Sequence, residues 1–100
     1  DHVSMGTTSA RTAAMVLDNT QKVIGIEIAA AAQAIWLRQE MGEGGIDKLA
    51  PATRAAYDYI RTLSAPIERD VIMHDGLIKF DKMVKNGELL KVVEKTVVLK

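Results

Sequence analysis

The stretch from residue 23 to residue 37 reads VIGIEIAAAAQAIWL and is apolar on nearly every face, interrupted only by Glu27 and Gln33. It lies within a longer segment that has no proline and many strong helix formers. A helix that is apolar all round is buried on all sides. A helix from about residue 7 to residue 39 would be roughly 50 Å long, whereas a compact domain of this size has a radius of gyration of only ~13 Å. The sequence therefore predicts a long core helix, residues 9–41, that is buried against partners outside this chain.

Shorter helices are predicted after the long one, within residues 51–95. The glycines that end the long helix tolerate positive φ at low cost, and they are Gly42, Gly44 and Gly45. Pro51 suits the first turn of a second helix, which Pro66 ends. Asp75 is the candidate N-cap of a third helix that stops at Asn86–Gly87, and residues 88–95 can add a short fourth one. The last residues could form a strand or fray. We predict an all-α fold of one long buried helix and two or three shorter helices.

The composition excludes several classes of protein. The chain has 13 Lys and Arg against 13 Asp and Glu, whereas a nucleic-acid-binding domain carries a basic excess on one face. It contains no cysteine, which excludes disulfides and thiolate metal sites. The apolar run is shorter than the ~20 residues needed to cross a membrane, and no secretory signal is visible. We therefore expect a cytoplasmic protein without nucleic-acid or membrane partners. Because the first residue is Asp, we also expect the chain to begin inside a longer protein.

An apolar stripe in the long helix predicts self-association. Positions 10, 14, 17, 21, 24, 28, 31 and 35 follow the i, i+4, i+7 spacing that places side chains on one helix face. Within this stripe the predicted oligomer core consists of Ile24, Ile28, Ala31 and Ile35. We expect these residues to pack in an oligomeric helical bundle. Trp36 is predicted to anchor an interface.

Residues with catalytic or metal-binding patterns are missing from the chain. His2 and His74 lack the partner spacing of a metal site, and no serine has the surroundings of a nucleophile. Arg54 and Asp58 are spaced as an ion pair on a helix surface. The alternative for this part of the second helix is recognition of a substrate carboxylate. Glu27 and Gln33 are predicted to make polar contacts between helices or to be partly exposed, and the alternative is that they line a central cavity of the assembly.

Four segments resemble the C-terminal region of histidine ammonia-lyases, in the aromatic amino acid ammonia-lyase family: DHVSMGTTSART, AAAAQAIWLR, PATRAAYDYIR and VKNGELLKVVEK. The resemblance covers essentially the whole chain but does not distinguish histidine from tyrosine or phenylalanine as substrate of a lyase or aminomutase. It implies a homotetramer built on long helices, with active sites shared between subunits. Such enzymes eliminate ammonia from an amino acid, giving urocanate from L-histidine. Their electrophile, a methylidene-imidazolone group, forms from Ala-Ser-Gly. This chain contains no Ser-Gly, so we expect that group in the missing N-terminal part.

The resemblance also implies where an active site borders this chain. Asp1, His2 and Ser4 match the edge of the family's active site and are expected to support it without touching the substrate. The family's active-site glutamate directly precedes the position of Asp1, and its tyrosine base and carboxylate-binding arginine match no motif here. Residues 1–8 are thus an active-site-edge leader, and residues 51–95 are outer helices. The family often has Asp where this chain has Trp36, which indicates an apolar contact at that helix end.

Two functions of different classes remain. In the first, the chain is the structural C-terminal part of an ammonia-lyase and is inactive by itself. In the second, it is an all-α oligomerisation module with no catalytic role.

Overall fold

The computed structural model describes residues 2–71 and 73–98, with the side chains of residues 2–4 excepted. The described residues form helices and turns with no strand, so the all-α prediction is confirmed. The elements are α1 (His2–Glu40), the 3-10 turn η1 (Ile46–Lys48), α2 (Pro51–Leu63), α3 (His74–Asn86) and α4 (Glu88–Glu94).

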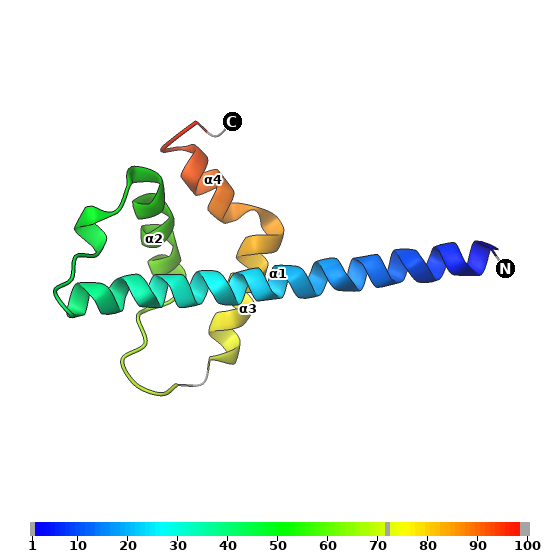
Figure 1. The fold of residues 1–100 in the computed structure, drawn as a ribbon, viewed down its shortest axis with the longest axis horizontal. Helices are drawn as coiled ribbons and strands as arrows, with labels where there is room; N and C mark the ends of the chain where they lie inside the picture. Colours follow the sequence, from blue (N-terminus) through cyan, green and yellow to red (C-terminus); the bar gives the residue numbers. More distant parts are fainter. Residues whose placement is uncertain (1, 72, 99–100) are drawn as a thin grey trace.

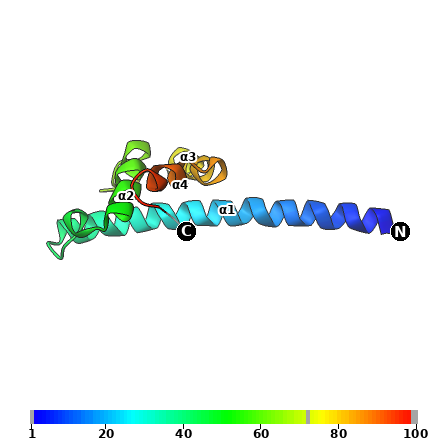
Figure 2. The same ribbon diagram turned by 90° about the horizontal axis from the view of Figure 1, so that it is seen from above.

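Helix α1 is a straight rod that extends beyond the rest of the molecule. The other helices gather on one side of its C-terminal half, and the N-terminal half projects alone (Figures 1 and 2). The molecule measures 62 × 38 × 20 Å and has a radius of gyration of 17.2 Å, compared with ~13 Å for a compact domain of this length. The chain therefore has too little mass outside α1 to wrap it.

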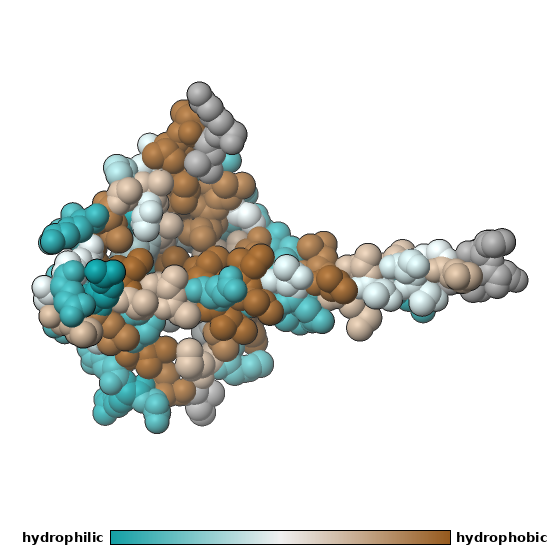
Figure 3. All heavy atoms as spheres, in the orientation of Figure 1, coloured by the Kyte–Doolittle hydropathy of each residue, from teal (hydrophilic) through white to brown (hydrophobic). Residues whose placement is uncertain are grey.

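We expected α1 to be buried against partners outside this chain. Its own chain leaves much of the helix exposed. Met15, Leu17 and Val23 expose 65%, 59% and 54% of their surface. The reason is visible in Figure 2, where the smaller helices cover α1 from one side only. The opposite side of its middle, which faces the viewer in Figure 3, carries apolar surface that a hydrophilic patch interrupts. Burial of this surface in an oligomeric bundle stays a prediction.

Helix α1 also begins earlier than we predicted. We predicted the long core helix over residues 9–41, but the helix starts at His2. The leader has no proline, and a single glycine such as Gly6 costs a helix interior only about 1 kcal/mol. Residues 2–8 therefore continue the helix.

The shorter helices follow the sequence signals closely. Helix α2 starts at Pro51 and ends at Leu63, as predicted. Gly87 ends α3 in the left-handed conformation, with φ of 71°. We predicted Asp75 as the N-cap of α3. The N-cap is instead Met73, two residues earlier, and no side chain makes a capping hydrogen bond there. Residues 96–98 form no strand.

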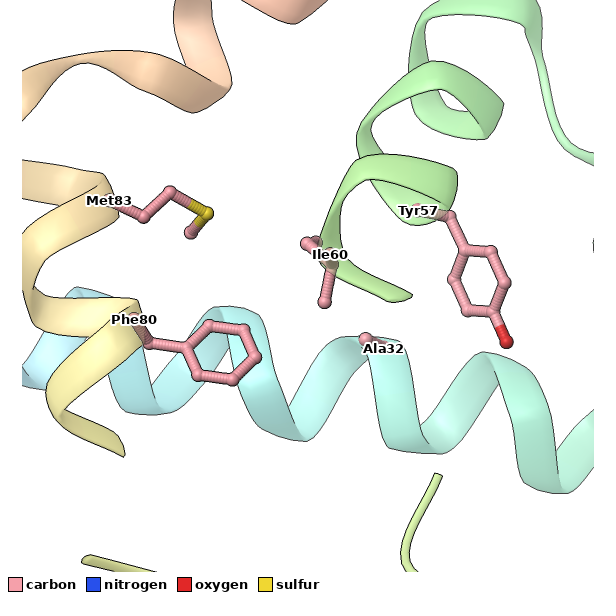
Figure 4. Packing of buried hydrophobic residues seen from close by; sticks show 5 residues of the cluster. All are labelled: Ala32, Tyr57, Ile60, Phe80 and Met83. Atoms are coloured by element: carbon pink, nitrogen blue, oxygen red, sulfur yellow. The ribbon is translucent and has the colours of Figure 1, made fainter. Parts of the chain in front are cut away.

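A small core joins α1, α2 and α3 (Figure 4). Its buried side chains are Ala32, Tyr57, Ile60, Phe80 and Met83. Helix α3 crosses α1 at the buried Gly25, where an added Cβ would lie 3.2 Å from the Phe80 carbonyl carbon. The absence of a side chain at Gly25 therefore permits the close approach of α3.

Candidate functional site

The predicted active-site edge lies mostly outside the described residues. Asp1 is not described, and the side chains of His2 and Ser4 are not described either. The backbone of His2 and Ser4 belongs to the first turn of α1, at the end that projects from the molecule (Figure 1). The role of these three residues stays a prediction.

The four predicted oligomer-core residues fall into two pairs. Ile28 and Ile35 are partly buried and pack against the core that α1 shares with α2 and α3. Ile24 is 39% exposed, and Ala31 is exposed as well. Only Ile24 and Ala31 thus remain available to another chain without disturbing this one.

A second set of apolar side chains lies on the uncovered side of α1. Val16, Val23, Ala30 and Leu37 are seven residues apart, a spacing that keeps them on one side of a helix. All four are exposed, with Val16 at 59% and Leu37 at 45%. We call these four residues the free face of α1. It has the spacing of a helix-packing seam, although the exposed Glu27 lies on the same side between Val23 and Ala30, and Ala30 also borders the groove described next.

A groove of about 620 Å³ opens between α1, the segment that joins α2 to α3, and α3 itself. We call it the connector groove. Its walls are mainly apolar and include Ile26, Ala30, Ile67, Leu77 and Phe80. The volume is within the range of about 300–1,000 Å³ that is typical of ligand pockets.

Two arginines, Arg61 and Arg69, line the groove, and Arg61 has donors that are shielded from solvent without a partner. Arg61 of α2 lines it, and the guanidinium carbon of Arg61 lies 5.1 Å from the ring centre of the buried Tyr57. Its Nη1 donates a hydrogen bond to the Ser64 carbonyl oxygen at 3.1 Å. Its Nε and Nη2 are shielded from solvent and have no hydrogen-bond partner. No carboxylate among the described residues forms an ion pair with Arg61, although the exposed Glu68 lines the same groove.

Gln33 fixes the connector to α1. Its Nε2 donates to the Ile67 carbonyl oxygen at 2.8 Å, and its Oε1 accepts from the Ile67 N–H at 3.0 Å. We had predicted either a contact between helices or a position lining a cavity. Gln33 contacts a connector instead of a helix, and it lines a groove of this chain, whereas a cavity of the assembly stays a prediction. Glu27, the other polar residue of the apolar run, is exposed.

An ion-pair cluster holds α3 against the middle of α1. Asp18 pairs with Lys22 of its own helix at 2.9 Å and with Lys85 of α3, which also pairs with Asp81 at 3.0 Å. The hydrogen bond from Lys85, followed by that from Lys22, lowers the pKa of Asp18 to about 2. The bonds to Asp18 and Asp81 raise the pKa of Lys85 above its usual range. The cluster is a partly exposed structural contact.

The predicted surface pair on α2 is confirmed. Arg54 Nε lies 3.0 Å from the carboxylate of Asp58. Among residues 2–71 and 73–98, no group of three or more His, Cys, Asp or Glu side chains could hold a metal ion. No helix in the described part of the chain is long and apolar enough to cross a membrane.

Comparison with known proteins places this arrangement in a family. The family model described as aromatic amino acid lyase matches residues 1–62, which include all of α1 and most of α2. The chain belongs to the aromatic amino acid lyase family. No solved structure matches it.

Relatives within the aromatic amino acid lyase family extend the likeness to α3 and α4. A histidine ammonia-lyase of Symbiobacterium thermophilum is 45% identical over 94 residues, which are 94% of this chain and 17% of the relative. Another, of Streptococcus sanguinis, is 41% identical over 99 residues, or 97% of this chain and 18% of the relative. Histidine ammonia-lyase 1 of Fusobacterium nucleatum is 35% identical over 97% of this chain and 18% of its own length. The chain thus spans less than a fifth of the length of these lyases.

Proposed function

We propose that this chain is the C-terminal helical part of an ammonia-lyase that eliminates ammonia from L-histidine to give urocanate. The observation that carries this proposal is the likeness to proteins named histidine ammonia-lyase over nearly the whole chain, at 35–45% identity. The amino-acid substrate would bind in the longer protein, in the cytoplasm, next to the leader residues 1–8.

The role proposed for this part is structural. The free face of α1 and the exposed Ile24 and Ala31 would pack against equivalent helices of other subunits in a homotetramer. Two features support this role: α1 is too long to be covered by its own chain, and its uncovered side is apolar at helix-packing spacing. Helices α2, α3 and α4 would cover the outside of that bundle.

The chain does not fit the family's electrophile. A methylidene-imidazolone group forms from Ala-Ser-Gly, and the three serines of this sequence are followed by Met5, Ala10 and Ala65. No residue of this chain can therefore supply the group, and we expect the chain to be inactive by itself. The chemistry would depend on the remainder of the longer protein.

Two measurements on the parent protein test the proposal. Its gene should encode Ala-Ser-Gly upstream of Asp1 and a glutamate directly before Asp1. The purified parent should form urocanate from L-histidine faster than it forms cinnamate from phenylalanine or coumarate from tyrosine. A preference for tyrosine or phenylalanine would overturn the assignment of the substrate. Absence of both sequence features would favour an oligomerisation module instead.

A further inference from the structure

The connector groove and Arg61 have no role in the proposed enzyme so far. Gln33 holds one wall of the groove at Ile67 through two hydrogen bonds. Its walls continue into exposed apolar surface at Ile26, Val71 and Met73, which expose 51%, 58% and 43% of their area. Contiguous apolar surface of this kind marks an interaction site.

We propose that the connector groove is the docking site for a segment of the remainder of the longer protein, which inserts apolar side chains and pairs an acidic side chain with Arg61. This inference rests on the proposed function, because it requires this chain to be part of a longer lyase. More than four-fifths of the length of the relatives lies outside the part that this chain matches. A large amount of protein is therefore available to cover the groove.

The charge of the occupant follows from Arg61. Two of its nitrogens are shielded from solvent without an acceptor, and unsatisfied donors of this kind destabilise a structure. Its stacking on Tyr57 and its bond to Ser64 hold the guanidinium at the groove. A guanidinium binds a carboxylate through two parallel hydrogen bonds. An Asp or Glu side chain would thus compensate this cation.

The shape of the site favours a protein segment over a small molecule. The groove is open along the exposed residues of the connector, so an occupant can enter and leave it as part of a chain. Ile26, Val71 and Met73 line the groove and are exposed, so an extended segment with several apolar side chains would cover them.

Photo-crosslinking in the full-length parent protein tests the proposal. A photo-reactive amino acid replaces Ala65, which is exposed and lines the groove, and in a control it replaces Thr53, which is exposed on α2 outside the groove. Mass spectrometry identifies the attached peptide. The probe at Ala65 should attach to one segment outside these 100 residues that contains Asp or Glu, and the probe at Thr53 should not reach that segment.

Arg61 variants test the charge pairing. Arg61→Met should lower the crosslinking yield from Ala65 by about tenfold, since a charge-assisted hydrogen bond is lost, and Arg61→Lys should retain most of it. If Arg61→Met does not fold, the proposal is judged from the unchanged protein, by whether the segment crosslinked there contains Asp or Glu. Attachment only within these 100 residues would overturn the proposal, as would a small carboxylate found in the groove by native mass spectrometry. Urocanate formation is measured separately, so an active enzyme without the crosslink contradicts only the docking proposal.

Discussion

The side-chain amide of Gln33 pairs with both backbone polar groups of Ile67, donating to the carbonyl oxygen at 2.8 Å and accepting from the N–H at 3.0 Å. The two residues are 34 positions apart in the sequence. A connector without regular structure is thereby fixed to the C-terminal half of the long helix. This contact explains why an amide occurs in an otherwise apolar run.

Replacing Gln33 by Met should loosen the connector. The substitution keeps a side chain of similar length but leaves the part-buried N–H and carbonyl of Ile67 without partners, at a cost of about 1–3 kcal/mol. Hydrogen exchange at the Ile67 amide should accelerate. Gln39→Met is the matched control, because the side chain of Gln39 accepts a hydrogen bond from the Ile46 N–H and makes none to Ile67. Unchanged exchange at Ile67 in Gln33→Met would contradict the assigned contact.

Gly25→Ala should lower the free energy of unfolding, because the added methyl group lies where α1 and α3 cross. The new Cβ would lie 3.2 Å from the Phe80 carbonyl carbon and 3.3 Å from the Asp81 nitrogen, so the helices must separate. Overpacking of this kind costs about 1–3 kcal/mol. Thermal unfolding followed by circular dichroism measures the effect.

Gly6→Ala in the same helix is the control for helix propensity. Nothing lies within 4 Å of its added Cβ, so the free energy of unfolding should rise by about 0.5–1 kcal/mol. Equal effects at the two glycines would show that the crossing contact is unimportant.

Local signals in the sequence predicted the shorter helices well and the environment of α1 less well. Proline and glycine have fixed backbone preferences, so Pro51 and Gly87 marked the ends of helices directly. Within the chain, Ile28 is partly buried and Ala31 is exposed, a difference that periodicity alone does not identify, and the packing of both in an oligomer core stays a prediction. The connector groove was missed, since residues 64–73 have no periodic pattern and the position of Arg61 depends on tertiary packing. Only the composition of the apolar run, residues 23–37, indicated that α1 needs partner helices to bury its surface.

The free energy of unfolding should fall in acid, because Asp18 becomes protonated and its ion pairs are lost. Its folded-state pKa, about 2, is below its ordinary value of 3.8, so its contribution is present above about pH 4 and is lost as the pH falls toward 2. The melting temperature of Asp18→Asn should therefore depend less on pH between 4 and 2 than that of the unchanged chain. Lys85→Met removes the main hydrogen-bond donor to Asp18. Its melting temperature should likewise depend less on pH between 4 and 2. Identical acid profiles for all three proteins would refute this role.

Charges on the uncovered side of α1 should prevent self-association. Val23→Glu or Ala31→Glu would place an unpaired charge in the proposed interface at a cost of about 3–5 kcal/mol. Both residues are exposed in the single chain, so helicity should be preserved. Ile28 is less suitable, because it packs against the chain's own core.

Thr53→Glu on α2 is the control for added charge, and it should leave the assembly unchanged. Light scattering coupled to size-exclusion chromatography measures the mass of each protein. A monodisperse monomer of the unchanged chain at high concentration would contradict the proposed packing.

The most direct test of the account is the formation of urocanate from L-histidine by the parent protein and by this chain alone, measured side by side. We expect the parent to catalyse the elimination and the isolated chain to show no turnover. Failure of the parent to form urocanate, or turnover by the isolated chain, would contradict the account.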